Sequence, residues 1–191
     1  FSHRVSILTG HYGTGKTEVS VNLALALAAE GEQVMLADLD IVNPYFRSRE
    51  RRPLLEKAGV RVISSSQACS DADVPALPAE LLTILENREI RGILDIGGDP
   101  VGARVLARFQ PKIVQEDYQL IYVLNANRPE VREAENAVSY LRGIEATTGL
   151  TCTGIVNNTH LCGETTVEEI LKGARLVREV SERTGLPVVC H

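Results

Sequence analysis

Residues 8–28 have the sequence LTGHYGTGKTEVSVNLALALA. Eight of them match the pattern GxxxxGK[ST] of a phosphate-binding loop: Gly10, His11, Tyr12, Gly13, Thr14, Gly15, Lys16 and Thr17. An apolar run at Val5–Thr9 precedes the loop and a helical pattern follows it, which is the context that the motif requires. This strand, loop and helix predict an α/β fold with a phosphate site at its centre.

The residue types of the loop have a chemical reason. Glycines allow successive backbone N–H groups to turn inward around an anion, and the N-terminus of the next helix adds a favourable field. We expect Lys16 to reach the β- and γ-phosphates of a nucleotide and the Thr17 hydroxyl to bind Mg²⁺. We therefore expect ATP and Mg²⁺ as the cofactors.

Apolar runs and helical patterns alternate along the whole chain. Several runs are almost continuously apolar, which is typical of strands covered on both faces of a parallel sheet. We predict a three-layer α/β fold, a mainly parallel sheet with helices on both faces, in a single domain over residues 1–191. The expected strands are Val5–Thr9, Val34–Asp38, Val60–Ser64, Gly92–Ile96, Leu120–Asn125, Cys152–Asn157 and Pro187–Cys190.

Two helices carry clear apolar stripes that we expect to pack onto the sheet. Glu130–Ile144 should begin near Pro129 and stop at Gly149, and Thr166–Thr184 should stop at Gly185. The first stripe comprises Val131, Ala134, Ala137, Val138, Leu141 and Ile144, and the second Val167, Ile170, Leu171, Ala174, Val177 and Val180.

Carboxylates follow two of the predicted strands. Gly92–Leu94 leads into Asp95, the position of the metal-holding aspartate in phosphate-loop enzymes, and Gly98 completes a DxxG arrangement that could sense a γ-phosphate. Asp38 and Asp40 end the second strand, where they could orient the attacking water or hold a metal-bound water. We assign Lys16, Asp38 and Asp40 to catalysis, and Thr17, Asp95 and Asp38 to the metal.

At this point the chain resembles the MinD/ParA-type ATPases, a class that includes the CobQ/CobB synthases and the nitrogenase iron protein. The likeness rests on the loop, Asp38-x-Asp40, Asp95-x-x-Gly98 and the segments NANRPEVREAENAVSYL and TGIVNN. It implies Mg-ATP binding and nucleotide-dependent homodimers. It also makes Asn157 the first candidate for adenine recognition and Asn158 the second, although both could be turn residues.

One departure from that family falls inside the loop. Its members carry a signature lysine after the first glycine, which reaches the phosphate of the partner subunit. Here His11 takes that place, Tyr12 follows where glycine is usual, and histidine is only partly protonated near neutral pH. The leading hypothesis is a nucleotide-controlled switch. Whether His11 stabilises charge on the phosphate of a partner subunit is left open.

Two alternatives remain. An ATP-dependent synthase or kinase similar to CobB or dethiobiotin synthase needs no signature lysine, and Ser64–Pro78 with Arg47, Arg49, Arg51 and Arg52 could line a carboxylate pocket. A non-hydrolysing nucleotide-binding assembly factor is the other. The arginine cluster could equally be a solvated helix face beside the irregular segment Leu39–Arg52.

The composition excludes some classes of binding partner. A net charge of −5 argues against non-specific binding to nucleic acid or anionic membrane, and no apolar run is long enough to cross a bilayer. The four cysteines lack metal-ligand spacing, which favours reduced thiols in a cytoplasmic protein. The chain starts without Met and closes on an unfinished strand, so we expect it to continue beyond His191. The protein partner cannot be named from sequence.

Overall fold

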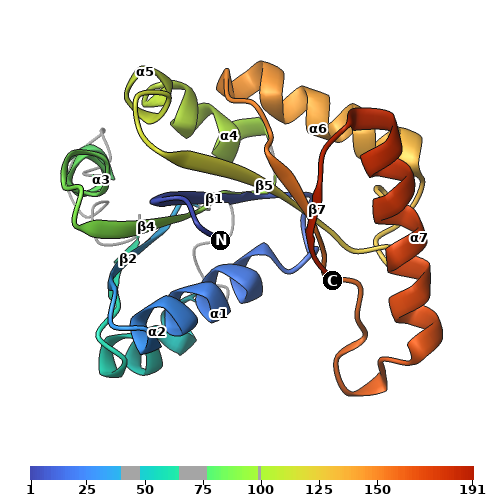
Figure 1. The fold of residues 1–191 in the computed structure, drawn as a ribbon, viewed down its shortest axis with the longest axis horizontal. Coiled ribbons are helices and arrows are strands. Elements are labelled where there is room, and N and C mark those ends of the chain that lie inside the picture. Colours follow the sequence, from blue (N-terminus) through green and yellow to red (C-terminus); the bar gives the residue numbers. More distant parts are fainter. Residues whose placement is uncertain (40–47, 65–76, 99) are drawn as a thin grey trace.

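The structure, a computed structural model, describes residues 1–39, 48–64, 77–98 and 100–191. Within these ranges one parallel sheet of seven strands runs through the molecule in the order β3-β2-β4-β1-β5-β6-β7 (Figure 1). The predicted α/β class is confirmed. The strands are β1 Val5–Thr9, β2 Gln33–Asp38, β3 Arg61–Ser64, β4 Ile90–Asp95, β5 Tyr118–Leu124, β6 Gly154–Asn157 and β7 Val188–Cys190.

Helices cover both faces of this sheet. Figure 1 shows α1 (Lys16–Ala29) and α2 (Ser48–Lys57) on one face, with α4 (Pro100–Ala107), α5 (Gln110–Ile113) and α6 (Ala134–Thr148) on the other. The helix α3 (Leu77–Glu86) packs on β4, and α7 (Val167–Thr184) packs on α6, β6 and β7. A short 3₁₀ turn, Cys162–Glu164, precedes α7.

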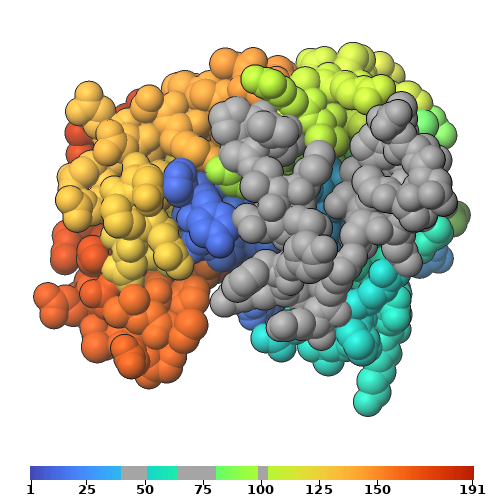
Figure 2. All heavy atoms as spheres, turned by 180° about the vertical axis from the view of Figure 1, so that it is seen from behind, coloured from blue at the N-terminus to red at the C-terminus, as the bar shows by residue number. Residues whose placement is uncertain are grey.

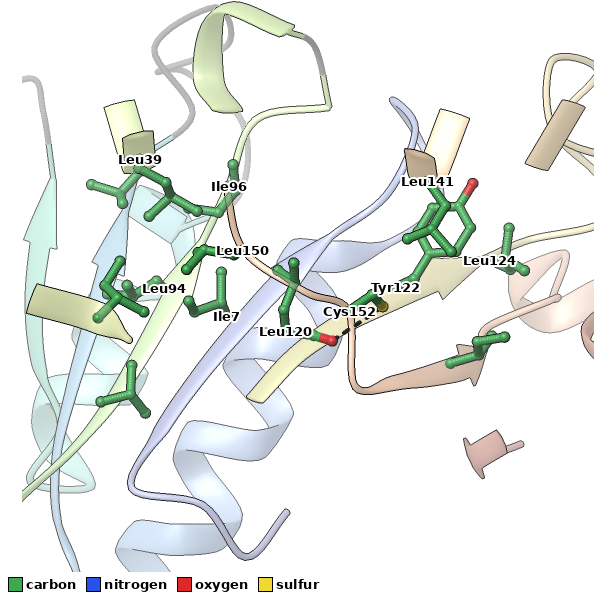
Figure 3. Close-up of a cluster of buried hydrophobic side chains, with 14 of the residues drawn as sticks. Ile7, Leu39, Leu94, Ile96, Leu120, Tyr122, Leu124, Leu141, Leu150 and Cys152 are labelled. Carbon is green, nitrogen blue, oxygen red and sulfur yellow. Dashed lines mark hydrogen bonds between the residues drawn. The ribbon is translucent and has the colours of Figure 1, made fainter. Parts of the chain in front are cut away.

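Two apolar cores lie on the two faces, because neighbouring residues of a strand point to opposite sides. In β1, Ile7 joins the core under α3, α4, α6 and α7, whereas Leu8 joins the core under α1 and α2. Figure 3 shows the first core, where Tyr122 of β5 lies beside Leu141 of α6. Each such buried side chain contributes about 1.5–3 kcal/mol, so both faces of the sheet are firmly held.

Two expectations about α6 have different outcomes. Its C-terminal stop is confirmed, since Gly149 adopts the left-handed conformation with φ of 69°. Its start at Pro129 is wrong, because the helix begins only at Ala134. The intervening residues form a turn in which the Val131 N–H donates to the Arg128 carbonyl at 3.1 Å. Tertiary position thus keeps Val131 buried without making it helical.

The expected stripe of α7 is only half correct. Thr166 caps the helix by accepting from the Glu169 N–H, and Val177 and Val180 are buried as predicted. However, Val167, Ile170 and Leu171 are exposed by 72%, 46% and 52%. The buried residues of the helix begin only at Gly173, so its first turns contribute little to the core.

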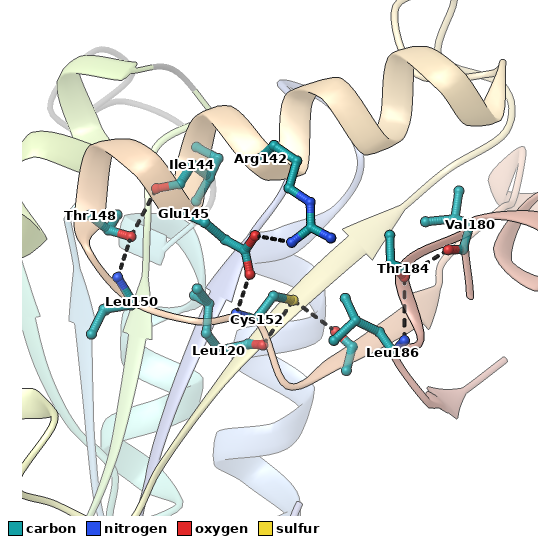
Figure 4. A network of polar contacts seen from close by, with 11 residues as sticks. Leu120, Arg142, Ile144, Glu145, Thr148, Leu150, Cys152, Val180, Thr184 and Leu186 are labelled. Carbon is teal, nitrogen blue, oxygen red and sulfur yellow. Dashed lines mark hydrogen bonds and ion pairs between the residues drawn. The ribbon is translucent and has the colours of Figure 1, made fainter. Parts of the chain in front are cut away.

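Polar contacts close the amino edge of the sheet beside α6 (Figure 4). Glu145 accepts from the Cys152 backbone N–H at 2.9 Å and pairs with Arg142 at 2.7 Å. Thr148 donates to the Ile144 carbonyl and accepts from the Leu150 N–H. These bonds satisfy the helix end and fix the chain as it enters β6.

Candidate functional site

The phosphate-binding loop runs from β1 to α1 and needs its glycines for steric reasons. Gly10, Gly13 and Gly15 have φ values of 149°, 75° and 87°, which L side chains rarely adopt. A methyl group on Gly10 would also collide with the Val123 carbonyl oxygen, and one on Gly15 with the Asn158 side chain. The loop is therefore wrapped closely by neighbouring loops at the carboxyl edge of the sheet.

Within the loop, the His11 carbonyl is a shared acceptor. It receives the Lys16 ammonium at 3.2 Å, the Thr14 N–H at 3.2 Å and the Thr14 hydroxyl at 2.9 Å. Lys16 is only 6% exposed although it carries a charge. It thus bridges the two ends of the loop, with its ammonium held where the loop closes.

The structure brings two of the predicted carboxylates together. Asp38 and Asp95 are register partners at the ends of β2 and β4, and they are 7% and 2% exposed. Asp95 also lies opposite Leu8 of β1, immediately before the loop. Asp40 and Asp99 lie outside the described residues. Buried carboxylates at adjacent strand ends are unusual and characteristic of sites that hold a cation.

Gly98 lies directly against the loop. A Cβ on it would stand 2.6 Å from the Tyr12 nitrogen and 3.0 Å from the Gly10 oxygen. Its carbonyl accepts a hydrogen bond from the Tyr140 hydroxyl of α6 at 2.7 Å. The His11 ring packs edge-on against Tyr140, with centroids 5.3 Å apart. Sequence reasoning quoted the segment that contains Tyr140 but assigned this residue no role.

Two side chains hold the outward face of the loop. Arg128, which follows β5, donates from Nε to the Gly13 carbonyl at 2.6 Å, and Asn158, which follows β6, donates to the Thr14 carbonyl at 2.8 Å. In a trans peptide the next N–H points the opposite way. The second bond therefore turns the Gly15 N–H toward the inner side of the loop. In Figure 2, atoms from the N-terminal part of the chain, coloured blue, lie at the surface beside the yellow atoms of residues near 125.

Arg128 was also missed from the sequence. Its signal was a single cation directly after a strand that neighbours β1, in the segment NANRPE. A tight turn fixes it, since the Arg128 N–H donates to the Asn125 carbonyl at 3.0 Å and the Asn127 N–H to the Asn125 side chain at 2.9 Å.

A cavity of about 590 Å³ opens between α1 and the carboxyl ends of β6 and β7. Glu18 and Val19 of α1 line it near the loop, opposite Asn157, Asn158 and His160. Asn157 is 6% exposed, and its side-chain oxygen accepts from the Thr159 N–H at 3.1 Å. Both asparagines thus border the cavity, while Asn158 also contacts the loop.

The arginine cluster extends only partly into the described region. Arg47 lies outside it, and of the four arginines only Arg51 and Arg52 have described side chains. Arg51 is exposed, whereas Arg52 pairs with Glu56 at 2.8 Å and donates to the Val62 carbonyl at 3.3 Å. Arg52 therefore ties α2 to β3.

Two buried ionisable groups away from the loop have shifted pKa values. Burial raises the pKa of Tyr122 above its usual range and that of the Cys152 thiol to about 11. Cys152, Cys162 and Cys190 are free thiols, and Cys69 lies outside the described residues. Over the described ranges no group of three or more His, Cys, Asp or Glu side chains is arranged to hold a metal ion. In the same ranges no helix has the length and apolar character that crossing a bilayer requires.

Sequence comparisons point to one class of protein. Residues 1–49 match the ParA family model described as NUBPL iron-transfer P-loop NTPase. The chain is 36% identical over 95 residues to the cytosolic Fe-S cluster assembly factor cfd1 of Emericella nidulans, covering 50% of this chain and 26% of that protein. It is 50% identical over 40 residues to the iron-sulfur cluster carrier protein of Escherichia coli, covering 21% and 11%.

Solved structures show the same fold. A nucleotide-binding protein in complex with ADP from Archaeoglobus fulgidus aligns with a TM-score of 0.59 at 16% identity, over 98% of this chain and 80% of that one. The cell division protein FtsY of Thermotoga maritima aligns with a TM-score of 0.59 at 20% identity, over 96% and 59%. The loop motif and the match over residues 1–49 support a MinD/ParA-like P-loop NTPase, and the solved structures show the shared fold.

Proposed function

We propose that this chain binds Mg-ATP, hydrolyses it and works as a nucleotide-controlled switch. The observation that carries the proposal is the juxtaposition of the phosphate-binding loop with Asp38 and Asp95 on neighbouring strands. P-loop NTPases are in general nucleotide hydrolases. In phosphoryl transfer the protein contributes mainly positioning and electrostatic stabilisation, which this arrangement can supply.

The donor set fits a magnesium nucleotide. The candidate ligands Thr17, Asp95 and Asp38 offer only oxygen atoms, which Mg²⁺ prefers, and bound Mg²⁺ would neutralise charge on the phosphates. The loop N–H groups and Lys16 bind and orient the β- and γ-phosphates. Asp38 orients the attacking water. The same role for Asp40 remains part of the proposal, although this residue lies outside the described region.

The base belongs at the upper end of the cavity. Asn157 and Asn158 border it at the end of β6, opposite Glu18 and Val19 in the first turn of α1. Amide side chains can donate to and accept from the edge of a purine. We therefore retain ATP as the nucleotide, with Asn157 as the primary contact to the base and Asn158 holding the loop.

His11 limits the comparison with the family. Its ring lies against Tyr140 and its Nδ1 stands 3.9 Å from a carboxylate oxygen of Glu130. A side chain held this way is turned toward its own chain. We propose that any nucleotide-dependent homodimer of this protein forms without a His11 contact to the partner's phosphate. The single-domain organisation over 1–191 and the cytoplasmic location remain predictions.

Phosphate release with Mg-ATP tests the central claim. Wild type should turn over ATP, Lys16→Ala should fall to background, and the surface control Lys112→Ala should match wild type. Equal background rates for wild type and Lys16→Ala would sink the ATPase proposal. Oligomer size measured with ADP and with a non-hydrolysable triphosphate then tests the switch. If turnover appears only with one added small metabolite, the synthase alternative is correct.

The relatives motivate a second candidate, a nucleotide-driven role in iron–sulfur cluster assembly. Their names describe a cluster assembly factor and a cluster carrier, and this chain spans only 26% and 11% of those two proteins. Of the described cysteines, Cys162 and Cys190 are exposed. Anaerobic incubation with iron and sulfide should give cluster absorption that scales with protein and survives desalting. Loss of all colour on desalting would contradict cluster binding by this chain.

A further inference from the structure

Tyr140 of α6 touches both halves of the nucleotide site. Its hydroxyl donates to the Gly98 carbonyl at 2.7 Å, and its ring meets the His11 ring at 5.3 Å. Gly98 belongs to the segment after Asp95, and His11 to the phosphate-binding loop. One side chain from a helix far along the sequence therefore joins the loop to the segment that follows the metal-holding carboxylate.

The Tyr140 ring is itself fixed. It stacks on Tyr122 of β5 with an interplanar angle of 15° and centroids 6.1 Å apart. Tyr122 is fully buried, and its hydroxyl donates to the Ala137 carbonyl of α6 at 3.1 Å. Aromatic stacking and low rotamer entropy make such a pair a rigid support. The Tyr140 ring is thus held from the core by Tyr122 and from the loop by His11.

The phosphate-binding loop restricts the position of Gly98. Its backbone lies so close to Gly10 and Tyr12 that even a methyl group would not fit. A γ-phosphate adds charge beside the loop, and segments that recognise it must keep their backbone at a fixed distance from it. The hydrogen bond from Tyr140 is a contact that can set this distance from outside the nucleotide site.

We propose that Tyr140 is a positioning residue for triphosphate hydrolysis: it holds Gly98 against the phosphate-binding loop, and His11 supports its ring. The inference rests on the proposed ATPase function. It also gives His11 a role within its own chain. The expected consequence is selective, because the contact reaches the segment beside the γ-phosphate and leaves the Lys16 end of the loop untouched.

Tyr140→Phe tests this with the smallest possible change. Loss of one neutral hydrogen bond should lower kcat by about 5- to 10-fold. The Kd for ADP should stay within about 2-fold, since ADP lacks the γ-phosphate beside the Gly98 segment, whereas the KM for ATP should rise together with the loss of triphosphate affinity. A kcat equal to wild type, or an equal loss of ADP affinity, would overturn the inference.

Two control variants separate positioning from folding. Tyr122→Phe removes a comparable bond to the same helix but none to Gly98, so its kcat should match wild type. Tyr118→Phe changes a half-buried tyrosine at the opposite edge of the sheet and should be silent. If Tyr122→Phe loses as much kcat as Tyr140→Phe at equal thermal stability, the effect comes from α6 as a whole and the inference fails.

A binding measurement keeps the outcome independent of turnover. The ratio of affinities for a non-hydrolysable triphosphate and for ADP should fall about 3-fold or more in Tyr140→Phe, because only the triphosphate carries the γ-phosphate. An unchanged ratio overturns the inference, whether or not the wild type hydrolyses ATP. Hydrolysis by wild type with no effect of Tyr140→Phe would leave the ATPase proposal standing alone.

Discussion

The sheet has an amino edge, where its parallel strands begin, and a carboxyl edge, where they end. The two edges contain different kinds of polar contact. At the amino edge, Arg4 lies just before β1, and its guanidinium donates to the carbonyls of Ile84, Leu85, Asn87 and Ile90 and to the Glu116 carboxylate at 2.6 Å. These bonds close the end of α3 and join it to β4 and β5. At the carboxyl edge, glycines in left-handed conformations and two buried carboxylates occupy the equivalent strand ends.

This difference separates stability from function. At the amino edge the terminal guanidinium nitrogens of Arg4 meet carbonyl and carboxylate acceptors, so these contacts are favourable without a ligand. At the carboxyl edge, two buried carboxyl groups that repel one another when both are ionised lie on adjacent strands, and the loop adopts conformations that require glycine. Such an arrangement is retained where a bound ligand offsets the unfavourable interactions. Changes at the first edge should therefore lower stability, and changes at the second should lower nucleotide binding.

The largest effect is expected from Lys16→Ala. Removing the ammonium should weaken ADP binding by about 100-fold or more, since a charge-assisted contact to phosphate is lost. The melting temperature without nucleotide should change little compared with the ADP affinity. Calorimetric titration and thermal unfolding check both parts. A variant that unfolds more easily and binds ADP normally would contradict the division between the edges.

The reverse outcome is expected for Arg4→Met. The side chains of Arg4 and Glu116 are only 11% and 16% exposed, so removing one partner leaves a poorly solvated charge. We expect a loss of about 3 kcal/mol in the free energy of unfolding, with the ADP affinity unchanged. Chemical denaturation measures the first quantity.

Lys112→Met is the matched control for Arg4. Its ion pair with Glu86 is short, at 2.5 Å, but the two side chains are 49% and 62% exposed. Solvent screening should limit its loss to about 0.5 kcal/mol. Equal losses for the two variants would show that burial is not what makes the Arg4 contacts important.

Cys152 gives the amino edge a pH dependence. Its pKa is raised to about 11 from 9.0 by burial, so folding favours the neutral thiol. This contribution is complete below pH 9 and is lost as the pH rises toward 11, a change of about 2–3 kcal/mol. The free energy of unfolding should fall between pH 8 and pH 11. This fall should be about 2–3 kcal/mol smaller in Cys152→Ala than in wild type. An identical pH dependence in both proteins would refute this assignment.

A small effect on nucleotide binding is expected from Asn158→Ala, which sharpens the role of that side chain. Losing its bond to the Thr14 carbonyl should weaken ADP and GDP binding alike, by about 5-fold, because the loop is less well held. The stability without nucleotide should change by less than about 1 kcal/mol. A loss confined to ADP would instead assign Asn158 to the adenine base.

Much of the fold could be predicted from local patterns. All seven strands are present, because parallel strands buried on both faces leave continuous apolar runs. The stops at Gly149 and Gly185 were also predictable, since a left-handed residue favours glycine. The start of α6 and the exposed first turns of α7 were not, because they depend on which surface lies opposite.

The candidate site divides in the same way. The loop residues, Asp38 and Asp95 were predictable because each is fixed by a short motif at a strand end. That the two aspartates lie opposite one another depends on β2 and β4 being neighbours, which the chain order does not specify. Arg128 and Tyr140 come from segments more than 100 residues away from the loop in sequence, so no spacing connects them to it.

By itself, the sequence indicated the class of chemistry: glycines, a lysine and a threonine in one loop predict an anion bound to backbone N–H groups. The tertiary structure decided how that loop is held. Strand order placed Asp38 beside Asp95, the loops after β5 and β6 turned two carbonyls outward, and α6 brought Tyr140 onto Gly98. The physical reason is that motif residues are close in sequence, whereas their supports become close only when the sheet assembles.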